Sequence, residues 1–567
     1  MTHPPCISLD SESLQKEWRN QCEWSLDGQE WSDCQHFASD PSANYPHLAE
    51  EPEVIIRSKE TIKVKEGECC FNLLYDFKVE LFGRIVVPIF KSGEKDVPKL
   101  YVGESMAEVS NEDASNHEQS TELGLEKSSG NGQQIFITKN CVAFRYARIV
   151  FDWNEENGNN TFPSLYCRAT FRPVQYKGAM ACSDQTLTRI WHHSAYTLCL
   201  CMNDFILDGM KRDRLPWAGD LIVSLLSNAF VFADKKIVAK TLTVLGRAGI
   251  SESHINGFAD YSLLWIICHD FYQLYFGDHG FLRREWSRIK QAIDILIGSC
   301  KDNGFLSAGQ NNIFIDWVKV FDKTVPLQII WWKALGCASA LAKRMKVSSL
   351  AESWFNLQGR VKEMILDMYW NQNGSGILLS RHANILAAAW GFPFPDKEYV
   401  AQALLGETIM PHTGTPYMKI FECLALSRLG HSCESVQRMQ QYWGGMLDCG
   451  ATTFWEAYEP SETTDAASSF YDRPFGRSMC HAWGAGPCHF IPEALFQIQP
   501  TSDGWKTWDC CCSSVPKMID FMYLTIPTPY GDIELELTKT VFSIKVPDGA
   551  TMNLEGKNYL GPTKVQR

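Results

Sequence analysis

Two short segments contain the carboxylates whose types and spacing could do chemistry. The first runs from Leu207 to Asp220 (LDGMKRDRLPWAGD) and holds three Asp and three basic residues. The second runs from Gly450 to Glu456 (GATTFWE) and ends on one Glu beside two aromatic residues. Hydrolysis of a glycosidic bond needs one carboxylic acid to protonate the departing oxygen and a second carboxylate to activate water or attack the sugar. The two segments together supply such a pair.

The first segment is predicted to be a loop. Pro216 and Gly219 argue against a continuous helix here, so its acids are expected on a connection at a helix end, where functional residues concentrate. These acids are Asp208, Asp213 and Asp220. The basic residues expected to hold the loop by ion pairs and hydrogen bonds are Lys211, Arg212 and Arg214. Two plainer interpretations stay open: Asp220 as the N-cap of the following helix, and the whole loop as a solvated run of charge.

Glu456 follows Phe454 and Trp455, and a carboxylate with aromatic walls is one whose pKa burial can tune. The plainer alternative is a buried structural glutamate paired with Arg473 or Arg477. A histidine such as His481, taken alone, is more often a core residue with satisfied hydrogen bonds than a catalytic one. The spacing alone therefore leaves the role of these residues open.

The composition excludes some classes of protein. The 567-residue chain has 45% hydrophobic residues and a net charge of −13, which is typical of a well-packed protein and argues against one that grips nucleic acid. No apolar run is long enough to predict a membrane span. The 21 cysteines lack the spacing of zinc ligands, so we expect reduced thiols and no metal. The first residues do not resemble a signal peptide, so a cytoplasmic location is expected.

The elements that must position these residues change in type along the chain. Short β-branched runs between residues 54 and 172 predict a β-sandwich, interrupted by a long polar mobile loop over residues 104–134. After residue 180, apolar residues at three- and four-residue spacing predict ten or more helices. Alternating patterns beyond residue 504 predict a small antiparallel β-domain. We therefore expect an N-terminal β-sandwich (1–178), a barrel of helical hairpins (179–500) and a C-terminal antiparallel β-domain (501–567).

The predicted helices are amphipathic stretches separated by Gly, Pro and Asn. They cover 187–205, 221–232, 261–276, 283–297, 324–344, 350–370, 398–405, 417–429, 435–446 and 486–496. Because no sequence repeat of solenoid length accompanies them, hairpins closed into a barrel explain them better than an open array.

At these segments the sequence resembles the α-L-rhamnosidases of glycoside hydrolase family 78. Other phrases that carry the resemblance are Tyr75-Asp-Phe77, Tyr101-Val-Gly-Glu-Ser105, Phe144-Arg-Tyr146, Phe314-Ile-Asp-Trp317 and His481-Ala-Trp483. The resemblance implies a multidomain, mainly α protein in which an (α/α)6 six-hairpin barrel is flanked by β-domains. It also implies an inverting hydrolase that removes terminal α-L-rhamnose without a cofactor, with a carbohydrate or rhamnosylated glycoside as its partner.

The resemblance also assigns roles to residues. Asp213 matches the general acid and Glu456 the base that activates water. The residues expected to bind the sugar on this resemblance are Asp208, Arg212, Trp217, Asp220, Asp316, Trp317, Trp455 and His481. The family's better-known members carry Glu as the acid, so the acid arm of Asp213 is one methylene shorter. Three rival functions stay open: a hydrolase of another α-L-sugar, a helical-barrel lyase, and an inactive sugar-binding protein. A fourth is a scaffold protein that uses the barrel only as a platform.

Overall fold

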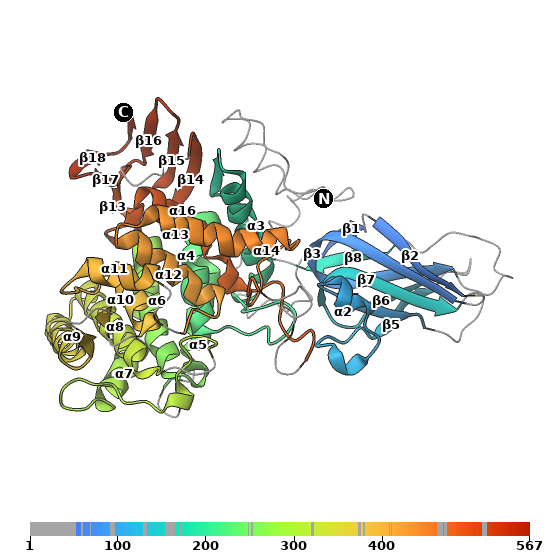
Figure 1. The fold of residues 1–567 in the computed structure, drawn as a ribbon, viewed down its shortest axis with the longest axis horizontal. Coiled ribbons are helices and arrows are strands. Elements are labelled where there is room, and N and C mark those ends of the chain that lie inside the picture. The colour runs from blue at the N-terminus through green and yellow to red at the C-terminus, as the bar shows by residue number, and fades with distance from the viewer. Residues whose placement is uncertain are drawn as a thin grey trace. The chain divides into compact units, whose positions relative to one another are not determined.

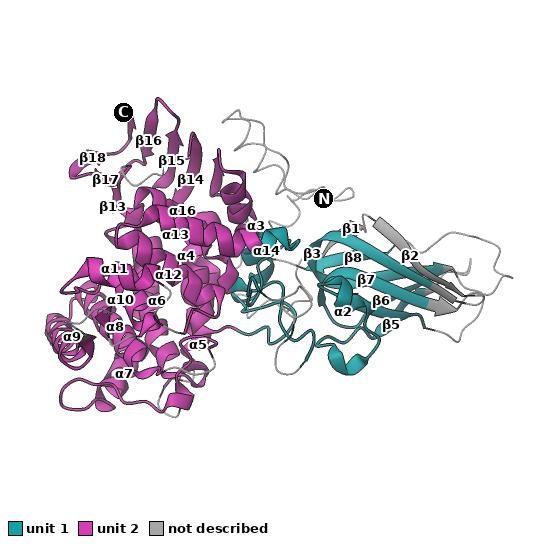
Figure 2. Ribbon diagram, viewed as in Figure 1, with its two compact units in different colours: residues 1–175, 196–215, 446–482 teal, residues 176–195, 216–445, 483–567 magenta. Residues whose placement is uncertain are grey.

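A computed structural model describes most of the chain. The described residues are 53–57, 60–67, 70–90, 97–128, 133–152, 165–170, 172–247, 249–250, 253–318, 322–371, 376–377, 380–406, 409, 411–461, 469, 473–512 and 519–566. They form two compact units (Figure 2). The first unit comprises residues 1–175, 196–215 and 446–482, and the second comprises residues 176–195, 216–445 and 483–567. Both predicted catalytic segments thus contribute residues to the first unit.

The first unit is built on an antiparallel β-sheet, whose strands are drawn in blue to cyan in Figure 1. Its strands are β1 (Glu53–Arg57), β2 (Glu60–Gly67), β3 (Cys70–Phe90), β4 (Lys99–Gly103), β5 (Leu123–Ser128), β6 (Gln133–Thr138), β7 (Val142–Asp152) and β8 (Tyr166–Thr170). The long strand β3 pairs with β2, β6, β7 and β8, and its register with β7 shifts between Asp76 and Leu81. Side chains from both halves of β3 line one hydrophobic core, so the sheet wraps around that core.

The polar stretch 104–134 is not the long loop that its composition predicts. It contains the helix α2 (Met106–Ser110) and strand β5, and β5 pairs with β6. Ser105 caps α2 by accepting a hydrogen bond from the backbone N–H of Glu108, as an N-cap serine does. The expectation was wrong because polar composition does not distinguish a solvated loop from polar side chains that find partners inside the protein.

Helices dominate the second unit. Along the chain the helices after α2 are α3 (Gln185–Cys201), α4 (Ala218–Val231), α5 (Lys235–Leu245), α6 (Ala259–Phe276), α7 (His279–Gly298), α8 (Thr324–Arg344), α9 (Ser348–Tyr369), α10 (Arg381–Ala389), α11 (Lys397–Leu405), α12 (Pro416–Arg428), α13 (Ser432–Met439), α14 (Gly445–Asp448) and α16 (Pro487–Phe496). The last residues of α3 and most of α14 belong to the first unit. Local sequence explains several starts. Asp234 caps α5 and Asp278 caps α7 through their carboxylates, and Thr415 caps α12 with Pro416 at its first position.

Six helices of this unit pack in a closed succession. Helix α4 contacts α6, α6 contacts α8, α8 contacts α10, α10 contacts α12, α12 contacts α16, and α16 contacts α4 again. Other helices pack outside this succession, α7 and α9 on α8 and α13 on α12. By length and composition α8 could cross a membrane, but 78% of its apolar window is buried inside the protein, as in the core helix of a globular domain.

Two small sheets complete the second unit. One has the strand order β19 (Thr563–Gln566), β16 (Phe542–Val546), β15 (Gly531–Leu537), β14 (Met522–Thr528), β9 (Ala179–Cys182). The other has the order β12 (Gln499–Pro500), β13 (Thr507–Cys510), β17 (Thr551–Leu554), β18 (Lys557–Leu560). Strand β9 pairs with β14 although more than 300 residues separate them in the sequence, so the residues just before α3 join the C-terminal sheet. The domain limits 1–178, 179–500 and 501–567 stay predictions.

Candidate active site

Glu456 is a buried carboxylate of the first unit, with 3% of its side chain exposed. Its Oε1 lies 2.5 Å from Nη2 of Arg212, and its Oε2 accepts a hydrogen bond of 2.7 Å from the backbone N–H of Ser478. Burial raises the pKa of Glu456 to about 7, although Arg212 and the Ser478 N–H both oppose this rise. Such a carboxyl group exchanges its proton near neutral pH, as a general base must.

Asp213 lies on a tight turn and is the more exposed of the two predicted catalytic carboxylates. The backbone N–H of Arg214 donates to the carbonyl of Arg212 across it, and Asp213 and Arg214 have φ values of 57° and 53°. Non-glycine residues rarely adopt this left-handed conformation, which costs on the order of 1 kcal/mol or more and persists only where the surroundings hold it. The side chain of Asp213 is 44% exposed, as a group that must reach a substrate can be.

One guanidinium group joins the two carboxylates. Nη1 of Arg212 lies 3.3 Å from Oδ2 of Asp213, while Nη2 of the same side chain binds Glu456. The structure therefore brings the predicted acid, the predicted base and Arg212 together. The plainer alternative for Glu456 was a buried glutamate paired with an arginine; the pairing arginine is Arg212, whereas Arg473 pairs with Glu118.

His481 lies beside the same carboxylate. Its Nε2 is 3.8 Å from Oε1 of Glu456, and burial, reinforced by the nearby charge of Arg212, holds the pKa of His481 well below its usual range. The imidazole is therefore neutral at neutral pH. Gly209 forms a β-bridge with His481, and a Cβ atom at Gly209 would come within 3.1 Å of the imidazole, so a larger residue there would force a small shift of the ring.

Asp208 is buried at the start of the loop, and its carboxylate points back into the protein. Its Oδ1 accepts a 3.0 Å hydrogen bond from the backbone N–H of Leu215, which closes the loop around Asp213. Burial raises the pKa of Asp208 to about 7, against the opposing effect of the Gly209 and Leu215 N–H groups. Asp208 is thus largely protonated in the folded protein under mildly acidic conditions.

Asp208→Asn should change the pH dependence of stability. Folding raises the pKa of Asp208 from 3.8 to about 7, so the folded state binds a proton that the unfolded state has already released between these pH values. The stabilisation that this proton gives is complete below pH 4 and is lost as the pH rises through 7. Asn cannot ionise, so the Tm of the variant minus that of the wild type should increase from pH 5 to pH 8. Thermal unfolding followed by circular dichroism measures this difference. The exposed Asp302→Asn variant supplies the baseline, and a flat difference for Asp208→Asn would contradict the assignment.

The other basic residues hold the loop, as predicted. The ammonium group of Lys211 is buried and lies 3.0 Å from a carboxylate oxygen of Glu104 and 3.0 Å from one of Glu108. Arg214 donates to the carbonyls of Met210 and Lys211 in its own loop, and also to the carbonyl of Cys141 and the side chain of Gln119. These bonds fasten the loop to β7 and to the segment before β5, and they hold the turn at Asp213.

The remaining predicted residues divide between the units. Trp455 is buried in the first unit, where its ring lies 5.9 Å from that of Tyr458. In the second unit the half-buried Trp217 packs on the rings of Phe258 and Tyr261. Asp220 lies within the first turn of α4 and is not its N-cap, which is Trp217.

Asp316 and Trp317 lie together in the second unit. The two carboxylate oxygens of Asp316 accept hydrogen bonds from its neighbour Trp317 and from three other groups, which are Nε2 of His382, the N–H of Gly414 and the hydroxyl of Thr415. Trp317 packs edge-on against Trp483 and Phe314. The roles of Trp217, Asp220, Asp316, Trp317 and Trp455 in sugar binding stay predictions.

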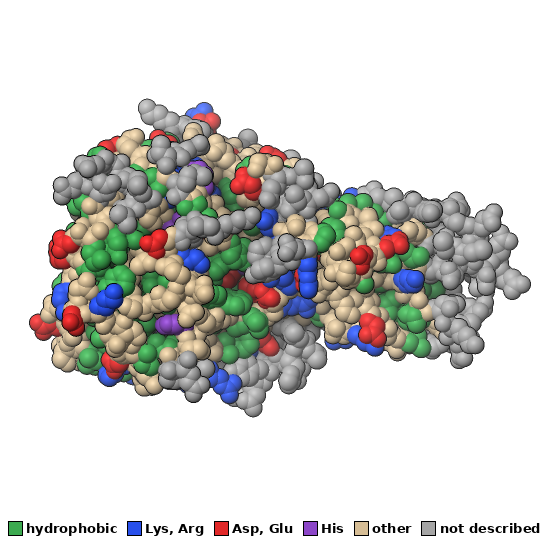
Figure 3. Space-filling view, turned by 60° about the horizontal axis from the view of Figure 1, so that its bottom comes forward, with side chains coloured by type: hydrophobic (Ala, Val, Ile, Leu, Met, Phe, Trp, Pro, Cys, Tyr) green, Lys and Arg blue, Asp and Glu red, His purple; other side chains and the backbone are tan. Residues whose placement is uncertain are grey.

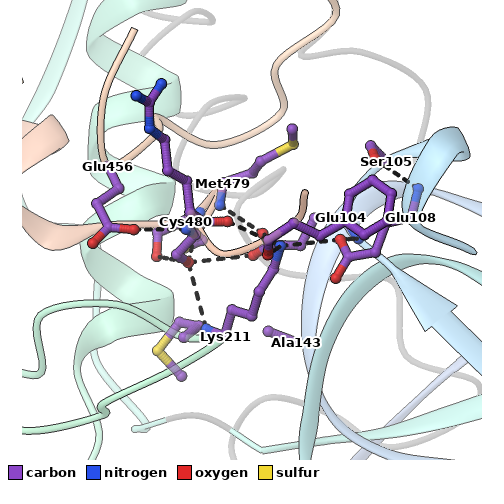
Figure 4. Close-up of polar contacts among 12 residues, drawn as sticks. Glu104, Ser105, Glu108, Ala143, Lys211, Glu456, Met479 and Cys480 are labelled. Atoms are coloured by element: carbon purple, nitrogen blue, oxygen red, sulfur yellow. Dashed lines mark hydrogen bonds and ion pairs between the residues drawn. The ribbon is translucent and has the colours of Figure 1, made fainter. Parts of the chain in front are cut away.

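Glu104 and Glu108 have a place near the site that the sequence analysis missed. Both are buried, and Glu104 accepts hydrogen bonds from the Ser478 hydroxyl and the Met479 N–H in the segment that also binds Glu456 (Figure 4). The spacing Ser105-x-x-Glu108 is that of a capping box and could have predicted the helix, but not the buried partner. Within the described part of the chain, no group of three or more His, Cys, Asp or Glu side chains is arranged to hold a metal ion.

On the face drawn in Figure 3, acidic and basic side chains are interspersed among apolar and neutral ones wherever the side chains are described.

Comparison with known proteins identifies the family. The six-hairpin glycosidase domain of bacterial alpha-L-rhamnosidases matches residues 175–495, more than half of the chain. No curated protein sequence matches. Among solved structures, the rhamnosidase of glycoside hydrolase family 78 from Bacillus sp. GL1 has a TM-score of 0.69 at 20% identity, over 88% of this chain and 54% of the other. The chain therefore spans about half the length of that structure.

Two further structures share the fold. The rhamnosidase from Klebsiella oxytoca with rhamnose bound has a TM-score of 0.61 at 22% identity, over 76% of this chain and 88% of its own. The alpha-L-rhamnosidase from Aspergillus terreus has a TM-score of 0.73 at 15% identity, over 91% of this chain and 64% of its own. With the match over residues 175–495, these observations show that the chain belongs to the bacterial alpha-L-rhamnosidase family of six-hairpin glycosidases.

Proposed function

We propose that the protein removes terminal, non-reducing α-L-rhamnose from glycosides by an inverting single displacement. Asp213 protonates the departing oxygen, and Glu456 takes a proton from the water that attacks the anomeric carbon. The observation that carries this proposal is the bridge of Arg212 between the carboxylates of Asp213 and Glu456. An exposed and a buried carboxylate thus contact one guanidinium group, which supports the proposal because glycoside hydrolysis requires two carboxyl groups near each other.

The bridge also suggests how Arg212 acts. Its guanidinium group donates to an oxygen of each carboxylate, so it fixes the orientation of both before a substrate arrives. Its charge favours the ionised form of Glu456, against the burial that raises the pKa of that group. Arg212 therefore keeps a buried base usable.

We further propose that the six helices in closed succession form an (α/α)6 barrel. The contacts from α4 through α16 and back to α4 support this closure. A cytoplasmic location is also proposed, because the cysteine spacing predicts reduced thiols, which persist in a reducing compartment.

The test is a panel of aryl glycosides. The purified protein is incubated with an aryl α-L-rhamnoside and with aryl glycosides of other α-L-sugars, and the released phenol is measured. Proton NMR at early times identifies the anomer formed before mutarotation. We expect β-L-rhamnose from the rhamnoside, whereas α-L-rhamnose would indicate a retaining route and contradict the inverting mechanism.

Two rival functions have distinct outcomes in the same panel. Release of a different sugar would identify a hydrolase of another α-L-glycoside. No release from any substrate, together with measurable rhamnose binding by calorimetry, would identify an inactive binding protein; the shorter acid arm of Asp213 favours this rival.

A further inference from the structure

A buried cluster of charges lies next to the two catalytic carboxylates without being part of them. The side chains of Lys211 and Glu104 are both 0% exposed, and that of Glu108 is 2% exposed. Burial by itself lowers the pKa of Lys211, but the two neighbouring carboxylates raise it above its ordinary value, so the ammonium group stays charged. Buried ion pairs contribute little net stability because desolvation offsets their attraction, so the cluster calls for another explanation.

Lys211 connects the loop of the acid with the segment that holds the base. It lies two residues before Asp213, and its ammonium group donates to the carbonyls of Phe475 and Arg477 at 3.0 and 2.9 Å. The backbone N–H of Lys211 also lies 3.4 Å from the hydroxyl of Ser478. A shift of the segment after Phe475 would therefore move the loop of Asp213 with it.

Glu104 holds the other end of this segment, as Figure 4 shows. Its Oε2 accepts a 2.6 Å hydrogen bond from the Met479 N–H and also pairs with Lys211, while its Oε1 accepts from the Ser478 hydroxyl. The N–H of Ser478 in turn donates to Glu456, and the N–H of Glu456 donates back to the Ser478 carbonyl. One residue, Ser478, thus separates Glu104 from the base.

We propose that Glu104 and Lys211 form a positioning pair that fixes the separation between Asp213 and Glu456. The inference rests on the proposed glycosidase function and adds to it a residue of the N-terminal sheet domain. Glu104 directly follows β4 and directly precedes Ser105, the N-cap of α2. The sheet therefore anchors the carboxylate that orients the Ser478–Met479 segment next to the base.

The physical reason is the narrow tolerance of the reaction. In an inverting hydrolase the two carboxyl groups stand about 6.5 to 9.5 Å apart to leave room for one water. A misplacement of about 1 Å costs roughly 10²-fold in rate. Hydrogen bonds from a charged donor are shorter and stronger than neutral ones, and the ammonium group of Lys211 makes three of them in addition to its ion pair with Glu104.

The test compares Glu104→Ala with the matched control Glu108→Ala. Each variant removes one buried carboxylate that lies 3.0 Å from Lys211 and leaves the other as its partner. Only Glu104 also binds the Ser478–Met479 segment, because the further bond of Glu108 goes to the N–H of Glu104. A purely structural role predicts equal losses of Tm and of activity in the two variants.

We expect similar losses of Tm but a different effect on catalysis. In Glu104→Ala, kcat for an aryl α-L-rhamnoside should fall about tenfold or more below that of Glu108→Ala, with KM changed less than about threefold. Glu104→Gln keeps an acceptor for the Met479 N–H and should recover most of the loss. Equal kcat values in the two alanine variants would overturn the proposal.

A second readout does not depend on turnover. Carbon-13 NMR of protein labelled at the glutamate carboxyl carbon follows the titration of Glu456, whose resonance is identified by its loss in Glu456→Gln. The midpoint should move in Glu104→Ala and stay unchanged in Glu108→Ala. If the wild type hydrolyses no glycoside, the proposed function fails while this titration still decides the positioning role; an unmoved midpoint in Glu104→Ala would overturn it.

Discussion

Glu456→Gln is expected to lower kcat for an aryl α-L-rhamnoside by roughly 10³-fold, within the range typical of a lost general base. Glutamine keeps the shape of the side chain and can still accept a hydrogen bond from the Ser478 N–H, but it cannot take a proton from water. Steady-state kinetics measures the loss, and circular dichroism verifies that the fold is retained. Glu459→Gln is the matched control, because this exposed glutamate lies three residues away in the same segment.

Glu456 should also set the pH dependence of kcat/KM in the wild-type protein. Since burial raises the pKa of Glu456 to about 7, the base is ionised only above that pH, and kcat/KM should fall tenfold per pH unit below it. The residual activity of Glu456→Gln should lack this acidic limb. Sodium azide should restore turnover in Glu456→Ala, because a small anion can replace the activated water and yield the β-rhamnosyl azide. Full activity in Glu456→Gln would remove this residue from the mechanism.

Asp213→Asn is expected to have an effect that depends on the leaving group. An alkyl rhamnoside has a poor leaving group that must be protonated, so kcat/KM should fall by roughly 10³-fold. A dinitrophenyl rhamnoside has a leaving group that departs without a proton, and its hydrolysis should fall less than about tenfold. Measuring both substrates with wild type and variant gives the ratio that identifies a general acid.

Asp208→Asn provides the contrast for this experiment. Asp208 lies in the same loop, but its carboxylate is buried and binds the Leu215 N–H, so it contributes to the loop rather than to the leaving group. The loss of kcat/KM in Asp208→Asn should be similar for alkyl and dinitrophenyl rhamnosides. If Asp213→Asn also showed equal losses for the two, Asp213 would not be the acid.

Most long helices of the second unit could be predicted from the sequence. Helix α8 begins and ends at the predicted residues, and α6, α7, α9 and α12 differ by only a few residues at either end. Amphipathic periodicity predicts such helices because each buries one face. Helix α5 was missed although Asp234 caps it and its buried residues have helical spacing. Helix α10 was also missed, although Ser380 caps it.

The stretch after Ser435 shows a second limit of periodicity. A single helix was predicted over 435–446, but the structure has α13, then a π-helical turn over Gln440–Gly444, then α14. A π-turn adds one residue per turn and changes which side chains face the core. Hydrophobic spacing does not resolve a local change of this size.

The carboxylates at the candidate site were recognisable from their type and context, but their partners were not. Asp213 and Glu456 stand out because each lies among basic or aromatic residues in a short segment. The arginine that pairs with Glu456 is Arg212, which is 244 positions away in the sequence, rather than the nearby Arg473. Glu104 and Glu108 looked like ordinary polar residues because their partner Lys211 lies about a hundred residues further on.

The sequence by itself determined the chemical groups available to this protein and the elements that hold them, because residue type and local periodicity depend only on near neighbours. The residues that cap α5 and α7, Asp234 and Asp278, are local in the same sense. Only the tertiary structure decided which carboxylates are buried, which cation each one faces and how far its pKa moves. Burial and ion pairing are set by atoms that are distant in the chain, and the raised pKa values of Asp208 and Glu456 follow from them.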